Sequence, residues 1–267
     1  MRFELPPWAA MWGLAIAIFA VFKAVTWRLA GAAAPIARRA GYLLLWPGMD
    51  PRPFIAQDRQ AARPLGNEWG QAVLNAACGA ALIWGAARSA AGVSLHLAGW
   101  AGMVGTVFLL HFGVFRLLGL AWRAQGVDAP AVMDAPCLAV SLSDFWGRRW
   151  NSAFRDLAFG LLFARTARRI GAVPATWAVF LASGLIHDLV ISVPAGGGYG
   201  LPTGYFLLQA AGLLAERTPL GRRLGLGSGP AGRAFAILVV AGPAYWLFHP
   251  PFVERVMLPF LGVIGAL

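Results

Sequence analysis

Long apolar segments constrain this chain more than any other feature of its sequence. A helix needs about 20 apolar residues to cross a hydrocarbon layer of about 30 Å. The segments are continuous rather than alternating, so they predict helices and not transmembrane strands. We therefore expect an all-α fold, a polytopic bundle of about seven to eight transmembrane helices. The candidate spans are 8–27, 71–88, 93–115, 173–193, 201–215, 233–249 and 253–267.

The composition agrees with a membrane-embedded protein. Hydrophobic residues make up 59% of the 267 residues and charged residues 12%, whereas soluble domains contain about 45–50% and about 25%. The sequence has no internal repeat and no low-complexity linker, which predicts one membrane-embedded domain over residues 1–267. Cys78 and Cys137 occupy poor positions for a disulfide, so we expect them to be packing residues.

The charges predict an orientation in the membrane. The loops 28–70, 116–172 and 216–232, with Arg233, hold 18 of the 22 Lys and Arg residues, and the opposite loops hold none. By the positive-inside rule the basic side is cytoplasmic, in a plasma membrane or bacterial inner membrane. Topology thus accounts for the net charge of +11, so we expect no nucleic-acid partner. Lys23 in the first span is expected to reach toward the interface.

The segment 116–172 is too long for a simple connector and too apolar for a solvated loop. An amphipathic helix lying in the interface, or a re-entrant segment, fits it. Within it, SLSDFWGRRWN ends at Asn151, whose amide follows arginines and is bracketed by aromatic residues. This grouping suits an anionic, partly hydrophobic ligand, although a basic helix on anionic lipid, with Asn151 as a surface or capping residue, has the same composition. The candidate binding residues are Trp146, Arg148, Arg149 and Trp150.

An ionisable residue inside a span is costly and faces a bundle interior or cavity. His187, in FLASGLIHDL, lies about 21 Å along its helix from the basic side. Thr176 and Ser183 share its helix face, so they form a polar stripe that leads toward it. Asp188 points about 100° away, which excludes a nucleophile triad. When His187 is considered without other residues, a structural histidine held by hydrogen bonds is the simpler interpretation.

Together, SLSDFWGRRWN and the later SGLIHDL, with His187 36 residues after Asn151, resemble the wax synthase branch of the membrane-bound O-acyltransferases. Plant members carry a closely similar SLxDFWGRRWN and a later SGLxHEL, so Asp188 stands where their pattern has Glu. GYLLLWPGMDPRPF, residues 41–54, gives weaker support. The resemblance implies a fold like that of these acyltransferases.

The resemblance also implies roles for the two motifs. His187 would be the general base that takes the hydroxyl proton, and Asn151 its active-site partner. The substrates would be acyl-CoA and a long-chain or other lipidic alcohol, esterified to a wax ester without a cofactor or metal. Thr176 and Ser183 would line the path of the pantetheine arm, and some of the arginines would bind the nucleotide end.

Other functions fit parts of the sequence. Within the same class, the acceptor could be a diacylglycerol, a sterol or a natural-product hydroxyl. A transporter or flippase also uses a membrane-buried His and Asp, but many transporters have two related halves, which this chain lacks. A third alternative is a membrane scaffold in which His187 is structural. The sequence carries no signal for the oligomeric state.

The charge asymmetry generates a topology prediction. The N-terminus and the loop 194–200 should face outward, while 116–172 faces the cytoplasm. A cysteine introduced at Gly197 should therefore be labelled from outside intact cells, and one introduced at Arg165 should not. Labelling at Arg165 with protection at Gly197 would overturn this orientation.

Overall fold

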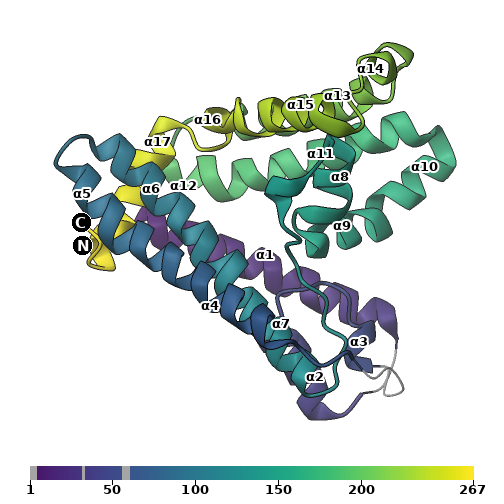
Figure 1. Cartoon of the computed structure of the whole chain (residues 1–267), viewed down its shortest axis with the longest axis horizontal. Coiled ribbons are helices and arrows are strands. Elements are labelled where there is room, and N and C mark those ends of the chain that lie inside the picture. Colours follow the sequence, from purple (N-terminus) through teal and green to yellow (C-terminus); the bar gives the residue numbers. More distant parts are fainter. Residues whose placement is uncertain (1–4, 32–33, 56–60) are drawn as a thin grey trace. The chain divides into compact units, whose positions relative to one another are not determined.

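The computed structural model describes residues 5–31, 34–55 and 61–267, and Arg2 and Arg59, two of the 22 cationic residues counted above, lie outside them. Throughout the described part, the regular elements are helices and none is a strand (Figure 1). Among these residues, five helices are long and apolar enough to cross a membrane. The prediction of a helical membrane protein is confirmed.

The five long helices cover five of the seven predicted spans. Several contain a π-helical segment, labelled η, in which the turn is widened by one residue. They are α1 (Pro7–Ala30); α4 (Gly66–Ala80) with η1 (Ala81–Ala87) and α5 (Arg88–Ala91); α6 (Leu95–Val107) with η2 (Phe108–Val114) and α7 (Phe115–Ala124); α11 (Ala172–His187) with η6 (Asp188–Ser192) and α12 (Val193–Ala195); and α15 (Gly229–Ala241) with α16 (Ala244–Leu247).

The other two predicted spans are also helical but shorter. Segment 201–215 is α13 (Leu201–Glu216), and the last segment comprises α17 (Pro250–Phe252), η7 (Val253–Met257) and α18 (Leu258–Val263). Neither reaches the length of the five, so the span count stays a prediction. Short helices complete the chain: α2 (Ile36–Leu45), α3 (Arg52–Ile55), the 3₁₀ turn η3 (Pro136–Leu138), α8 (Leu142–Asp144), η4 (Phe145–Arg149), α9 (Ser152–Ala158), η5 (Phe159–Phe163), α10 (Ala164–Ile170) and α14 (Pro219–Arg223).

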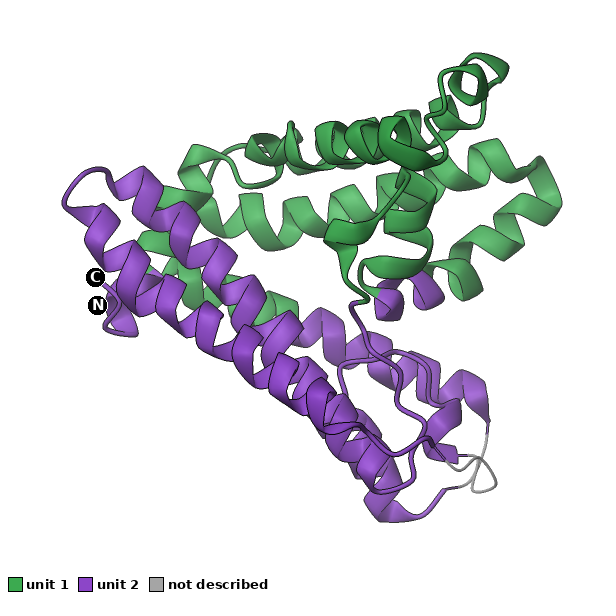
Figure 2. Cartoon of the chain, viewed as in Figure 1, with its two compact units in different colours: residues 1–15, 134–151, 158–259 green, residues 16–133, 152–157, 260–267 purple. Residues whose placement is uncertain are grey.

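Two compact units divide the chain (Figure 2). The first comprises residues 1–15, 134–151 and 158–259, and the second comprises 16–133, 152–157 and 260–267. The single domain over 1–267 stays a prediction, as does the in-plane or re-entrant placement of 116–172. The first unit contains both sequence motifs. Cys78 and Cys137, expected to pack inside, are exposed, so that expectation was wrong.

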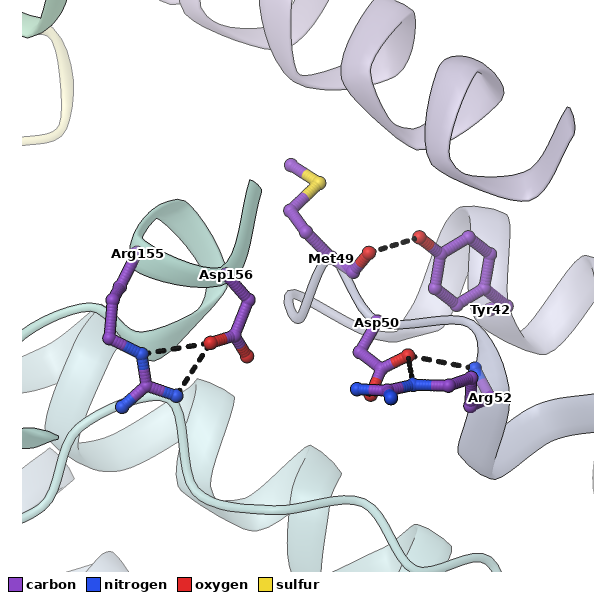
Figure 3. Close-up of polar contacts among 6 residues, drawn as sticks. All are labelled: Tyr42, Met49, Asp50, Arg52, Arg155 and Asp156. Atoms are coloured by element: carbon purple, nitrogen blue, oxygen red, sulfur yellow. Dashed lines mark hydrogen bonds and ion pairs between the residues drawn. The ribbon is translucent and has the colours of Figure 1, made fainter. Parts of the chain in front are cut away.

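In the second unit a buried lysine anchors a loop. Lys23 is 1% exposed, its Nζ donates to the carbonyl of Gly48 at 2.6 Å, and it lies 3.3 Å from the ring centroid of Tyr42. The hydroxyl of Tyr42 donates to the carbonyl of Met49 at 3.1 Å (Figure 3). Burial raises the pKa of Tyr42 to about 12, so this donor keeps its proton at neutral pH. Lys23 thus extends to the carbonyl of a loop residue, which satisfies its amine inside the protein.

Exposed ion pairs lie near this loop. Asp50 accepts from the Nε of Arg52 at 2.8 Å, and Asp156 accepts from the Nε of Arg155 at 2.8 Å (Figure 3). The hydrogen bond from Arg52 to Asp50, together with the charge of Asp50, raises the pKa of Arg52. The side chain of Arg52 is 82% exposed, so water screens this pair and it adds little stability.

Close packing of α11 against α13 forms the core of the first unit. A Cβ at Gly184 would lie 2.6 Å from the Cα of Thr203, so only glycine permits the two helices to approach this closely. Aromatic and aliphatic side chains fill the surrounding space. The buried residues of this core are Leu142, Phe180, Tyr205, Phe206, Ala210, Leu213 and Ala236.

Gly184→Ala should therefore force α11 and α13 apart. We expect a loss of about 1–3 kcal/mol of stability, the usual cost of overpacking, measured as thermal unfolding in detergent. Gly160→Ala is the matched control, because that helical glycine in the same unit has nothing within 4 Å of the added Cβ. Equal stability of the two variants would contradict this account of the contact.

Candidate active site

Helix α13 touches both sequence motifs. The ring of Phe206 lies 4.4 Å from the imidazole of His187 and 5.8 Å from the indole of Trp146, centroid to centroid. Trp146 also packs edge-on against Phe180, on the same helix as His187, at 5.7 Å. The structure thus brings the SLSDFWGRRWN segment and the helix of His187 onto one aromatic cluster.

The hydrogen bonding of His187 determines which ring nitrogen carries a proton in the neutral imidazole. Its Nδ1 lies 2.7 Å from the carbonyl oxygen of Ser183, one helical turn earlier. A carbonyl can only accept, so Nδ1 donates and Nε2 keeps its lone pair. An imidazole in this tautomer can take a proton at Nε2. The role of His187 as a base stays a prediction.

The polar stripe on α11 is present, but its hydroxyls are engaged. Thr176 donates to the carbonyl of Ala172 and Ser183 to that of Val179, each at 2.9 Å. Both side chains are buried. Their hydroxyl oxygens can still accept a hydrogen bond. Their predicted contact with substrate stays a prediction.

A carboxylate from α13 holds the start of the first motif. The side chain of Glu216 is buried and accepts from the backbone N–H groups of Leu142 and Ser143, both at 2.9 Å. Ser141 caps the same turn, because its Oγ accepts from the N–H of Asp144 at 3.0 Å. The first N–H groups of a helix have no partner within it. Glu216 therefore anchors the motif to the last residue of α13.

The two arginines of the motif share one carboxylate but differ in exposure. Asp144 pairs with the Nε of Arg148 at 2.9 Å and with that of Arg149 at 2.7 Å. Arg149 also donates to the carbonyls of Asp134 and Ala135, at 3.2 and 3.3 Å. The side chain of Arg149 is 14% exposed and that of Arg148 is 62% exposed. The bonds of Arg149 hold the loop that precedes the motif, whereas Arg148 is the more accessible to an anionic ligand.

The environment of Asp144 favours its ionised form. Burial alone would raise its pKa, but hydrogen bonds from Arg149 and the N–H of Val140, with the charges of both arginines, bring the pKa below the ordinary value. A depressed pKa means that this carboxylate stabilises the fold above the pKa of the unfolded chain, and that the contribution is lost as the pH falls through the folded pKa. At neutral pH, Asp144 is therefore a charged partner for both arginines.

Asn151 has an unusual backbone conformation. Its φ is +44°, in the left-handed region, which Asn tolerates better than most residues other than glycine. The ring of Trp150 stacks on that of Phe145, with centroids 5.5 Å apart and planes 12° apart. Asparagine thus has a backbone reason to stand here, independent of any chemistry of its amide. The predicted catalytic role of the amide stays a prediction.

A buried amide on α13 that was not predicted from the sequence also contacts the first motif. Gln209 is 0% exposed; its Nε2 donates to the carbonyl of Val239 at 2.7 Å, and its Oε1 accepts from the indole N–H of Trp146 at 3.3 Å. The carbonyl of Val239 lacks its helical donor because residue 243 is proline. Tyr205 likewise donates to the next carbonyl, that of Val240, at 3.1 Å.

A sequence signal for these residues existed. Gln209 is a neutral amide within the apolar segment LLQAAGLLAE, and Glu216 is the acidic residue that ends it. A proline inside an apolar helix leaves the carbonyl four residues before it without a donor. A polar side chain in a neighbouring apolar segment, such as that of Gln209, can donate to this carbonyl. Among the described residues, no three His, Cys, Asp or Glu side chains gather as metal ligands would.

Comparisons with known proteins agree with the motif resemblance. Residues 129–208 match the family described as "Membrane bound O-acyl transferase family". Over 162 residues, 54% of this chain and 46% of the relative, the chain is 29% identical to "Probable long-chain-alcohol O-fatty-acyltransferase 3" of Arabidopsis thaliana. It is 32% identical to "Long-chain-alcohol O-fatty-acyltransferase" of Simmondsia chinensis over 102 residues, 33% of this chain and 29% of the relative.

A further relative, "Probable long-chain-alcohol O-fatty-acyltransferase 7" of Arabidopsis thaliana, is 30% identical over 146 residues, 49% of this chain and 42% of the relative. The chain thus matches less than half the length of each of these relatives. These findings confirm the resemblance to the wax synthase branch of the membrane-bound O-acyltransferases. Both motifs, at 141–151 and 183–189, lie within the family match.

Two substitutions at Asn151 separate its backbone from its amide. Asn151→Gly removes the amide and keeps the left-handed conformation, whereas Asn151→Ala removes the amide and adds a backbone cost of about 1–2 kcal/mol. If the amide stabilises developing charge, both variants should lose about a hundredfold in acyl transfer, and Asn151→Ala should unfold at a lower temperature than Asn151→Gly. Turnover and thermal unfolding in detergent measure the two effects. Full activity of Asn151→Gly would show that Asn151 is a turn residue only.

Proposed function

We propose that this protein transfers an acyl group from acyl-CoA to the hydroxyl of a long-chain or other lipidic alcohol. The observation that carries the proposal is the convergence of two motifs on α13, with Phe206 against His187 and Gln209 against Trp146. Both motifs lie in the segment that matches membrane-bound O-acyltransferases. The names of the relatives supply the acceptor class, a long-chain alcohol.

The proposed reaction uses the free lone pair of His187. The alcohol oxygen attacks the thioester carbonyl carbon while Nε2 takes the hydroxyl proton. The carbon–sulfur bond then breaks, and the proton passes to the departing thiolate, so an ester and free CoA are formed and the imidazole is regenerated. The amide of Asn151 would donate to the thioester oxygen as negative charge develops there.

Acyl-CoA is proposed as the acyl donor because its charge complements that of the motif arginines. Acyl-CoA carries phosphates, which arginine recognises well. Arg148 is the more exposed of the two motif arginines and is the preferred candidate for the nucleotide end. Trp146 and Trp150 would contact the apolar part of the substrates, and Thr176 and Ser183 the pantetheine arm.

The test is alcohol-dependent release of CoA thiol by purified protein. His187→Ala and His187→Gln should each reduce this release by at least about a hundredfold, the size of a general-base contribution, with normal membrane insertion and thermal unfolding. His96→Gln is the control, because that histidine lies on α6, in the second compact unit, where it accepts a hydrogen bond from Trp100. Near-normal turnover of folded His187→Ala would contradict the base assignment. No alcohol-dependent thiol release by the native protein would overturn the proposed function.

A further inference from the structure

Asp188, the residue after His187, is surrounded by hydrogen-bond donors. One carboxylate oxygen accepts from the Oγ of Ser192 at 2.9 Å and from the N–H of Gly200 at 2.8 Å. The other accepts from the N–H of Thr203 at 3.0 Å and from its Oγ1. An ionised carboxylate only accepts, so the two oxygens satisfy four donors from three residues.

These bonds connect α11 and η6 to the first turn of α13. The N–H groups at the start of a helix have no acceptor within that helix. Asp188 supplies it for Gly200 and Thr203, and therefore caps α13 from a neighbouring helix. Phe206 follows Thr203 by three residues, so both lie on the same face of α13. The ring of Phe206 covers His187 at 4.4 Å.

A buried histidine, His249, is linked to the carboxylate of Asp188 through the hydroxyl of Ser192. The Nε2 of His249 lies 3.1 Å from the Oγ of Ser192, and its Nδ1 accepts from the N–H of Phe252 at 3.3 Å. Because a peptide N–H only donates, the neutral ring carries its proton on Nε2 and donates it to Ser192. The hydroxyl proton of Ser192 is thereby directed away from His249, toward Asp188 at 2.9 Å, which is a shorter contact than the carbonyl of Gly198 at 3.3 Å. The side chain of His249 is 0% exposed.

This direction of hydrogen bonding excludes a nucleophilic triad. An activated serine donates to histidine, which in turn donates to a carboxylate. Here Ser192 donates to Asp188 and accepts from His249. Ser192 is also 0% exposed, so no substrate reaches it without rearrangement. The arrangement of Asp188, Ser192 and His249 orients the carboxylate and performs no chemistry.

We propose that Asp188 is a positioning residue for His187. By holding Thr203, its carboxylate fixes the position of α13 relative to α11 where Phe206 packs on the imidazole. The ring of His187 is thereby held between Phe206 and the carbonyl of Ser183, with Nε2 presented in one direction. The catalytic consequence rests on the proposed function, because it assumes that His187 is the base. The orientation of the His187 ring is independent of the proposed function.

A matched pair of substitutions at Thr203 tests the link. Thr203→Val removes the hydroxyl donor to Asp188 but keeps the shape and the backbone N–H, whereas Thr203→Ser keeps the hydroxyl. Asp188→Asn replaces an acceptor by an amide whose nitrogen faces donors. Thr106→Val is the control, since its hydroxyl donates to a carbonyl of its own helix, that of Gly102 at 2.8 Å.

The first measurement does not depend on turnover. Diethyl pyrocarbonate modifies an accessible imidazole nitrogen, and mass spectrometry of solubilised protein gives its rate at His187. Thr203→Val and Asp188→Asn should loosen Phe206 and raise that rate by about tenfold, the size of one lost hydrogen bond to a charged group. Thr203→Ser and Thr106→Val should stay within about twofold of the native protein.

The second measurement is steady-state kinetics. Thr203→Val should lower kcat by about tenfold with KM changed by less than about twofold, because binding residues are untouched and only the base is displaced. Thr203→Ser should restore kcat. Thermal unfolding in detergent identifies a variant that has lost its fold, and Thr203→Val keeps the test available if Asp188→Asn does not fold.

The outcomes distinguish the two proposals. Native modification rates in folded Thr203→Val and Asp188→Asn would overturn the positioning role, whatever the activity. An equal rise in Thr106→Val would also overturn it, because the effect would then be general loosening. The expected rates together with no thiol release by the native protein would uphold the positioning and overturn the proposed function.

Discussion

Backbone polar groups that a helix leaves unpaired must be satisfied inside the protein when the surroundings are hydrocarbon. In the first unit, side chains of α13 and its neighbours perform this task. Glu216 accepts from the start of the motif helix, Gln209 and Tyr205 donate to carbonyls freed near Pro243, and Asp188 accepts from the start of α13. Each of these bonds joins two segments of the chain. The side chains that satisfy the unpaired backbone groups therefore also fix the geometry of the site.

Much of the fold and part of the site could be predicted from the sequence. The helices follow from apolar length, and His187 stood out because an ionisable group in a span requires a reason. The partners could not be predicted, because Trp146 and Gln209 lie 63 residues apart and Ser143 and Glu216 lie 73 apart. Nor could the sequence reveal the tautomer of His187, which depends on which nitrogen faces the carbonyl of Ser183.

Neighbouring residues of one type acquired different surroundings. Arg148 and Arg149 are indistinguishable in a motif, yet one is largely exposed and the other holds a loop through two carbonyls. Asn151 shows a related ambiguity, since its left-handed backbone and its amide each provide a reason for asparagine. The type of a residue shows which chemistry its side chain can perform. Its hydrogen-bond partners in the structure show which of its atoms are still available for a ligand.

The buried side chain of Lys23 has a consequence for the order of assembly. Its acceptor, the carbonyl of Gly48, follows it by 25 residues. During synthesis α1 therefore emerges from the ribosome before the group that satisfies its amine exists. The amine of Lys23 therefore reaches its final environment only after the chain has been extended past this loop.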